Sequence, residues 1–270
     1  MKKIITFIFC FWCINLNAQE LRIVSVGSNI TEILYALELG EHVVAADKTS
    51  TEPAAAISKA LLGHPSNISM EGALSYLPTH YISDDKYPNP SLYHKLEDTN
   101  IKAIILPQAT TVNELTEQIT LIGKAFNRQN QAQSLITSLN SKRRKLSQLK
   151  SDKKIKAAFI YGKDSLLMMG KNTSVDHLLT LASIENSFTF EGIKPVNPES
   201  LLMANPDVLL TVDKALNNKT RFFTLPGITG TTAGKNRIMY AIPIKQVNIT
   251  LKTLDTALEL HHLIYNSVQH

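Results

Sequence analysis

Cysteine is almost absent from this chain of 270 residues, because only Cys10 and Cys13 occur and both lie near the amino terminus. The rest of the chain therefore has no disulfide, and its stability must come from an ordinary hydrophobic core. No later stretch is long and apolar enough to cross a membrane. The formal net charge of +5 is small, which argues against a nucleic-acid partner.

The motifs of common enzymes are also missing. The chain has no G-x-S-x-G elbow, no Walker loop and no G-x-G-x-x-G motif. No histidine pair has the H-E-x-x-H or close His/Cys spacing of a zinc site. A small-molecule hydrolase on an α/β scaffold would need a nucleophile, a base and an orienting residue that converge on one cleft. The sequence does not display such a set, so we predict a protein that is not an enzyme.

The first 18 residues (1–18) have the pattern of a secretory signal peptide. Two lysines precede an apolar run from Ile4 to Ile14, and Ala18 is the small residue before a cleavage point. The run is too short for a membrane span. Bulky aromatic residues precede Cys13, whereas a lipoprotein signal needs small ones. We expect a periplasmic mature chain that begins near Gln19. Removal of the signal peptide takes away its two lysines and lowers the formal net charge from +5 to +3.

Strand-like and helix-like segments alternate in both halves of the chain, which indicates α/β lobes with mainly parallel sheets. In the first half we predict strands at 21–26, 42–46 and 101–106, a weak helix at 53–62, and a helix from the capping box at Thr111 to Phe126. In the second half we predict strands at 155–161 and 237–242, a loop-rich stretch at 162–171, and helices at 173–181 and 253–268.

A stretch without glycine or proline separates the two halves, from Lys124 to Tyr161. Its polar part has apolar residues at helical spacing, which suits one exposed helix of roughly 20 residues and about 30 Å. A surface helix inside a single domain is the alternative. We interpret the stretch as a rigid connector, and predict an N-terminal α/β lobe (19–126), a connecting helix (127–151) and a C-terminal α/β lobe (152–270).

One short phrase occurs twice, at 68–82 and 196–210, with a constant offset between the copies. Each copy predicts an N-capped helix, a proline stop and a strand, with Glu71 or Glu199 in the first helical turn. The helix dipole favours negative charge there and explains each glutamate singly, but it does not explain why both halves use one. The pair predicts docking, in which one acidic side chain per lobe meets a basic pocket on a two-fold partner.

Two histidines and one serine are candidate ligand residues. His64 lies in a Gly-His-Pro turn before the first repeat helix, where a loop between strand and helix would face a cleft. His177 follows Asp176 at a helix start in the other half. Lone histidines are more often structural, so that role stays open for both. Ser28 sits at a strand-to-helix turn, where it can bind a polar ligand edge or cap the helix.

Five segments, in order and at family spacing, resemble the periplasmic haemin-binding proteins of ABC importers. These belong to the class III, vitamin B12-binding-like group of substrate-binding proteins, which includes siderophore binders. Residues 22–37 resemble the opening of that family, 47–53 its D-x-T-S-x-x-P phrase, and 68–72 its L-S-x-E-G phrase. Residues 190–195 and 225–237 resemble phrases of the second lobe, so the match spans nearly the whole mature chain.

The resemblance implies two Rossmann-like lobes joined by one long helix, with the ligand held between them. It implies that the protein delivers haem, as a transported ligand rather than a catalytic cofactor, to an inner-membrane ABC importer. It also implies that Glu71 and Glu199 dock on arginines of the two permease subunits. We expect a monomer without a nucleic-acid partner. A cobalamin or ferric-siderophore binder is the alternative, and an adaptor with a vestigial cleft is another.

The chain departs from the family where members have a tyrosine after the glycine that matches Gly63, with an arginine two residues beyond it. Here those positions hold His64 and Ser66. Histidine is a competent axial ligand of haem iron, so we predict His64 in that role and His177 as a second metal candidate. The further predicted ligand-binding residues are Ser28, Asn29, Lys48, Thr49, Tyr87 and Lys194. Other candidates are Lys163 and Lys171 for a propionate and Tyr93 for a phenolate or stacking contact.

Overall fold

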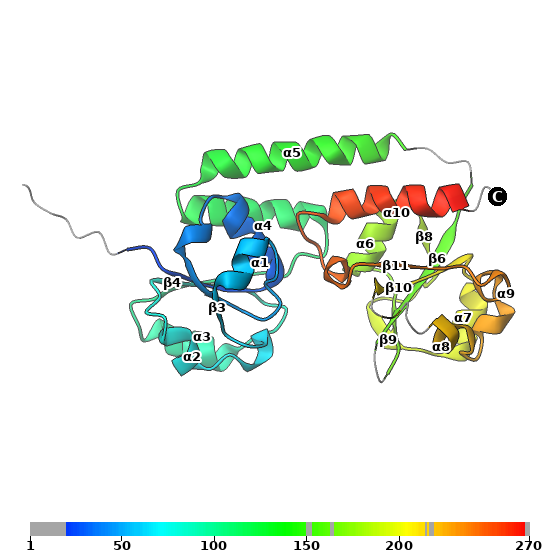
Figure 1. The fold of residues 1–270 in the computed structure, drawn as a ribbon, viewed down its shortest axis with the longest axis horizontal. Coiled ribbons are helices and arrows are strands. Elements are labelled where there is room, and N and C mark those ends of the chain that lie inside the picture. Colours follow the sequence, from blue (N-terminus) through cyan, green and yellow to red (C-terminus); the bar gives the residue numbers. More distant parts are fainter. Residues whose placement is uncertain (1–19, 150–152, 163–164, 214, 216–218, 268–270) are drawn as a thin grey trace, which may run out of the picture.

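The chain folds into two α/β lobes that lie side by side, as Figure 1 shows. The computed structural model describes residues 20–149, 153–162, 165–213, 215 and 219–267. The predicted signal peptide (1–18) and Lys163 lie outside these residues. The two-lobed α/β prediction is confirmed, and no helix in the described part of the chain is long and apolar enough to cross a membrane.

The N-terminal lobe is built on an entirely parallel sheet of five strands in the order β3-β2-β1-β4-β5. The strands are β1 (Ile23–Val26), β2 (Val43–Ala46), β3 (Ala60–Leu61), β4 (His80–Asp84) and β5 (Lys102–Leu106). Helices cover both faces, so the central strands are buried on both sides and read as apolar runs. The helices are α1 (Ser28–Ala36) and α4 (Val112–Ala125) on one face, and α2 (Met70–Leu74) and α3 (Pro90–Glu97) on the other.

Short 3₁₀ turns complete this lobe, at Gly40–His42 (η1), Ala54–Ser58 (η2) and Pro65–Asn67 (η3). The weak helix predicted at 53–62 is wrong, because this stretch contains η2 and the edge strand β3. Ala60 pairs in parallel with Ala45 of β2, and this pairing overrides the helix propensity of the preceding alanines. The capping box predicted at Thr111 is confirmed, with Glu114 as its second member.

The C-terminal lobe has a mixed sheet in the order β11-β10-β6-β7-β9, with β8 also paired to β6. The strands are β6 (Lys156–Tyr161), β7 (Leu167–Met169), β8 (Glu185–Asn186), β9 (Ile193–Pro195), β10 (Val208–Val212) and β11 (Met239–Ile242). Strand β7 runs antiparallel to β6 and β9, so the stretch predicted as a loop at 162–171 contains a strand. The connection from β6 to β7 is too short for a parallel crossover, so the chain returns antiparallel.

Helices cover both faces of this sheet as well. They are α6 (Ser174–Leu181) and α10 (Thr253–Ser267) on one face, and α7 (Pro198–Ala204), α8 (Lys219–Phe223) and α9 (Thr232–Asn236) on the other. Two 3₁₀ turns lie at Ile228–Gly230 (η5) and Ile244–Val247 (η6). The helices predicted at 173–181 and 253–268 are thus found as α6 and α10.

The predicted connector is the 19-residue helix α5 (Gln129–Ser147), which runs along one edge of both lobes. It rests on α4, where the approach is so close that a Cβ on Gly123 would come within 2.7 Å of the Ala132 methyl group. It reaches α10 through Leu139 and Leu146, which belong to an apolar core shared by both lobes. A shared core and one stiff helix restrict the motion of the lobes. The lobe boundaries at 126/127 and 151/152 stay a prediction.

Candidate ligand-binding site

A cavity lies where the carboxyl ends of β1, β2, β4 and β5 meet the C-terminal lobe. In an open parallel sheet, ligands bind at this edge, beside the point where the strand order reverses; here that point lies between β1 and β4. The cavity of about 60 Å³ holds only a few water molecules, so a large ligand would occupy its mouth. The lining residues are Gly27, Ser28, Asn29, Thr49, Pro65, Asp84, Lys86, Tyr87, Gln108, Ala109, Asn248 and Ile249.

Asp47 fixes the loops at the wall of this cavity. Its carboxylate is 1% exposed and accepts hydrogen bonds from Gly27 N at 2.6 Å, Thr49 N at 2.7 Å and Thr49 Oγ1 at 2.5 Å, and from Ser50 Oγ at 2.7 Å. The loop after β2 is therefore tied to the turn that begins α1. The Asp-x-Thr-Ser phrase builds this wall, and the Thr49 hydroxyl that we predicted as a ligand contact is engaged with Asp47.

The start of α1 forms the floor of the site. Gly27 has φ 104° and caps the helix with its backbone, a conformation that favours glycine. Ser28 lines the cavity, and the buried Asn29 donates from Nδ2 to Gln118 Oε1 at 2.9 Å. Lys48 is exposed and does not line the cavity. Of the residues predicted at this wall, Ser28, Asn29, Thr49 and Tyr87 are brought together and Lys48 stands outside.

His64 stands at the mouth, next to cavity residues Pro65 and Tyr87. It is the N-cap of η3 and exposed, and its ring meets the Tyr87 ring edge-on with centroids 5.0 Å apart. Burial, followed by the neighbouring Tyr161, raises the pKa of Tyr87. A phenolate at Tyr87 is therefore disfavoured, while a neutral imidazole needs no deprotonation to ligate iron. His64 and Tyr87 thus lie side by side at the mouth.

Ser66 holds the His64 ring through Nδ1. His64 Nδ1 lies 2.8 Å from Ser66 Oγ and accepts from Ser66 N at 3.3 Å. With Nδ1 unprotonated both Ser66 groups can donate to it, because a hydroxyl can donate as well as accept. Ligation of a metal through Nε2 requires the other tautomer, in which Nδ1–H donates to Ser66 Oγ.

A partly buried polar cluster that the sequence analysis did not identify lines the cavity. Lys86 Nζ donates to Asn248 Oδ1 across the lobes, and its backbone N–H donates to Asp84 Oδ1 at 3.2 Å. Burial raises the pKa of Asp84 to about 6 against the opposing effect of the Lys86 contacts, and burial lowers the pKa of Lys86. Their place at the carboxyl end of a predicted parallel strand could have identified Asp84 and Lys86 as site candidates.

A second contact between the lobes lies beside α1. Lys245 Nζ and Lys252 Nζ bind the two carboxylate oxygens of Glu52 at 2.9 and 3.4 Å. The hydrogen bond from Lys245 has the largest effect and lowers the pKa of Glu52; burial opposes it, and the charges of both lysines add to the lowering. Glu32, 6% exposed, accepts from Leu251 N at 3.3 Å, and burial raises its pKa to about 7. The segment 245–252 therefore holds the two lobes together.

Two other predicted ligand residues lie away from the cavity. His177 Nε2 accepts a hydrogen bond from Val112 N at 3.1 Å, which joins α6 to the start of α4. Burial, followed by the nearby Arg143, lowers the pKa of His177, which suits this neutral acceptor. Lys194 is exposed on β9 with its ammonium 4.9 Å from the Phe190 ring centroid. In the described part of the chain, no group of three or more His, Cys, Asp or Glu side chains is placed to share a metal ion.

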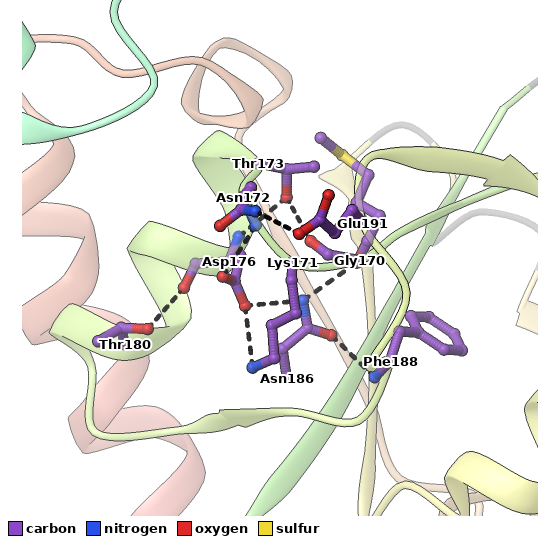
Figure 2. Close-up of polar contacts among 10 residues, drawn as sticks. Gly170, Lys171, Asn172, Thr173, Asp176, Thr180, Asn186, Phe188 and Glu191 are labelled. Atoms are coloured by element: carbon purple, nitrogen blue, oxygen red, sulfur yellow. Dashed lines mark hydrogen bonds and ion pairs between the residues drawn. The ribbon is translucent and has the colours of Figure 1, made fainter.

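Lys171, an alternative propionate contact, belongs to a polar network in the C-terminal lobe (Figure 2). Its ammonium lies 3.3 Å from Asp176 Oδ1, which also accepts from Asn186 Nδ2 at 3.1 Å. The other oxygen of Asp176 accepts from Asn172 N at 3.2 Å. This network ties the start of α6 to β8, so it accounts structurally for Lys171. Tyr93, the other alternative, contacts the Tyr81 ring in the core below the sheet.

The two repeat helices have the predicted local structure. Ser69 Oγ accepts from Gly72 N at 3.0 Å at the start of α2, and Asn197 Oδ1 accepts from Ser200 N at 3.0 Å at the start of α7. Glu71 and Glu199 are both exposed in the first turn. Figure 1 shows α2 and α7 beyond their sheets, on the side of the molecule away from α5. The two glutamates thus belong to equivalent first turns of two helices that lie on the same side.

Comparison with known proteins agrees with this architecture. The chain is 26% identical to the periplasmic heme-binding protein RhuT from Roseiflexus sp. RS-1, with a TM-score of 0.85 over 92% of this chain and 99% of that one. It is 25% identical to the periplasmic heme-binding protein HutB of Vibrio cholerae, with a TM-score of 0.83 over 91% and 99%.

A curated relative is an uncharacterized ABC transporter substrate-binding lipoprotein, YvrC of Bacillus subtilis (strain 168). The two are 23% identical over 208 residues, which span 74% of this chain and 66% of that relative's length. The sequence profile described as periplasmic binding protein matches residues 23–245. This match covers most of both lobes and indicates an extracytoplasmic protein. The resemblance seen in the sequence is confirmed, and the chain belongs to the periplasmic binding protein family.

Proposed function

We propose that this protein captures haem at the mouth between its lobes and delivers it to an inner-membrane ABC importer. The observation that carries the proposal is the placement of His64 at that mouth, with its hydrogen bonds made through Nδ1. The names of the similar proteins RhuT and HutB, both described as heme-binding, support the ligand class. The proposal includes no covalent chemistry, in keeping with a family of binding proteins.

Different residues of the site contact different parts of the haem. His64 Nε2 ligates the iron, with Ser66 fixing the ring. The Tyr87 ring, at 5.0 Å from His64, packs against a porphyrin face. Lys86, released from Asn248 when the mouth widens, supplies a cation for a propionate in place of the family's arginine.

Other polar side chains hold the edges of the ligand. Ser28 offers its hydroxyl, and Asn29 Oδ1 and Thr49 Oγ1 offer acceptors, because Asn29 Nδ2 already donates to Gln118 and the Thr49 hydroxyl to Asp47. Lys48 and Lys194 are exposed cations on the two lobes. A second metal role for His177 is not part of the proposal, since its Nε2 accepts from Val112 N.

Delivery uses the two exposed glutamates. Glu71 and Glu199, one per lobe, dock on basic side chains of a two-fold permease dimer. The protein reaches the periplasm through a cleavable signal peptide (1–18) and acts there as a monomer.

Haemin titration of the mature protein tests the ligand and its donor. We expect wild type to give a saturable change in the Soret band at micromolar haemin. His64→Ala should bind at least ten-fold more weakly, with an altered spectrum. His94→Ala is the matched control, because that side chain is 87% exposed on α3 and should leave both unchanged. Absence of a Soret change in wild type refutes haem binding, and a wild-type spectrum and affinity in His64→Ala refutes the donor. Corrinoid binding that is insensitive to His64→Ala would replace haem with cobalamin.

A further inference from the structure

The two most exposed large apolar side chains in the described part of the chain lie in the two copies of the repeat, which also hold the proposed docking glutamates. Met203 is 86% exposed and Leu77 is 76% exposed. Met203 belongs to α7 and Leu77 follows α2, so each lobe has one. Isolated exposed apolar residues are common, but one in each copy of the repeat, at non-equivalent positions near the end of its helix, needs an explanation.

The apolar side chain of the second copy shares a helix face with its glutamate. Met203 follows Glu199 by four residues, which places both on one face of α7, and Leu202 beside it is 52% exposed. Leu77 lies in the turn that ends the first repeat copy, six residues after Glu71. The helices α2 and α7, which hold the two glutamates, both lie on the side of the molecule away from α5 (Figure 1).

The backbone at Leu77 is unfavourable for a leucine. Its φ is 46°, and it is the one apolar residue among the seven non-glycine positions with positive φ in the described ranges. The equivalent position of the second copy is Asn205, with φ 36°, a residue type that tolerates the left-handed region. The Arg22 side chain holds the turn by donating to Tyr76 O at 2.7 Å and to Leu77 O at 3.1 Å. A leucine that is both strained and exposed favours a role outside the folding of the chain.

We infer that Leu77 and Met203 are apolar anchors of the docking surface, and that each enters an apolar pocket beside the basic side chain that receives Glu71 or Glu199. The inference rests on the proposed docking on a two-fold permease dimer. An apolar anchor next to a charge excludes water from the ion pair, which is typical of the strongest positions in protein interfaces. The partner surface that fits is a pair of symmetry-related periplasmic pockets on the permease dimer, each with one cation and an apolar wall.

The test uses the haem-loaded mature protein and the purified importer of the same organism, with permease and ATPase subunits in nanodiscs. Leu77→Asn introduces the residue type found at Asn205, the equivalent position of the second copy, so we expect an unchanged or higher melting temperature. Because the apolar side chain is lost, we expect about ten-fold weaker binding to the importer. Met203→Gln should weaken binding to a similar extent. Leu121→Gln is the control, because Leu121 is 48% exposed and belongs to α4, the helix that lies next to α5. Haem affinity should be that of wild type in all three variants.

A fourth variant, Glu71→Lys with Glu199→Lys, separates this inference from the proposed docking. If this double variant loses binding while Leu77→Asn and Met203→Gln bind like wild type, the anchors are refuted and the glutamate docking stands. If the double variant binds like wild type, the docking proposal itself fails and the anchors fail with it. Weaker binding in the glutamate and both anchor variants, with Leu121→Gln unaffected, supports the inference.

Discussion

Replacing Glu32 by glutamine should remove a pH dependence from the stability of the fold. Glu32 is 6% exposed where α1 meets the segment 245–252, and burial raises its pKa from 4.5 to about 7. A backbone hydrogen bond from Leu251 and the charges of Lys252 and Lys245 oppose this shift, and the charge of Glu52 adds to it. The folded state thus holds a proton on Glu32 that the unfolded chain releases near pH 4.5.

The sign of the effect follows from this difference in proton binding. Below pH 4.5 both states are protonated and the stabilisation is complete; as pH rises from 4.5 to 7 it is lost. The shift is about 2.5 units, and at 1.36 kcal/mol per unit the free energy of unfolding falls by about 3 kcal/mol over this range. In a chain of this size that corresponds to roughly 6–12 °C in melting temperature. Glu52, whose pKa is lowered, acts with the opposite sign at lower pH.

Thermal and urea unfolding between pH 5 and pH 8 measure this change in the free energy of unfolding. Wild type should lose stability as pH rises, while Glu32→Gln should lose markedly less, since the amide is neutral throughout and can still accept from Leu251 N. Glu41→Gln is the control, because Glu41 is exposed and should keep the wild-type slope. Equal slopes in wild type and Glu32→Gln would refute the reasoning.

Two further predictions concern the walls of the site. Asp47→Ala should lower the free energy of unfolding by about 3 kcal/mol or more, because four donors in a buried site lose their acceptor; a urea midpoint equal to that of wild type would contradict the role of Asp47. Ser66→Ala should weaken haemin binding several-fold by freeing the His64 ring, measured by the same Soret titration, whereas Ser58→Ala, whose hydroxyl donates to Ala55 O, should not.

Features that depend on neighbouring residues were predictable from the sequence. The capping box at Thr111 and the N-caps of α2 and α7 use contacts within three residues, so their residue types identify them. The long helix followed from the absence of glycine and proline. The repeat identified Glu71 and Glu199 as a pair from the sequence alone, because both copies keep the same local pattern.

Features made by distant residues were not predictable. Lys86 and Asn248 are 162 positions apart, and the local sequence around either residue does not indicate that the other is its partner. The same holds for Glu52 with Lys245 and Lys252. Strand β7 was missed because three residues give no periodic signal, and its direction depends on pairing with β6 and β9. The proposed apolar anchors depend on the exposure and backbone angles of the folded chain, which no sequence pattern supplies.

The most direct test of the account is a crystal structure of the mature protein in complex with haemin. The account predicts haem at the mouth between the lobes, with its iron within bonding distance of His64 Nε2, His64 Nδ1 hydrogen-bonded to Ser66 Oγ, and Lys86 no longer held by Asn248. Haem ligated by another residue, or bound outside the space between the lobes, would contradict it.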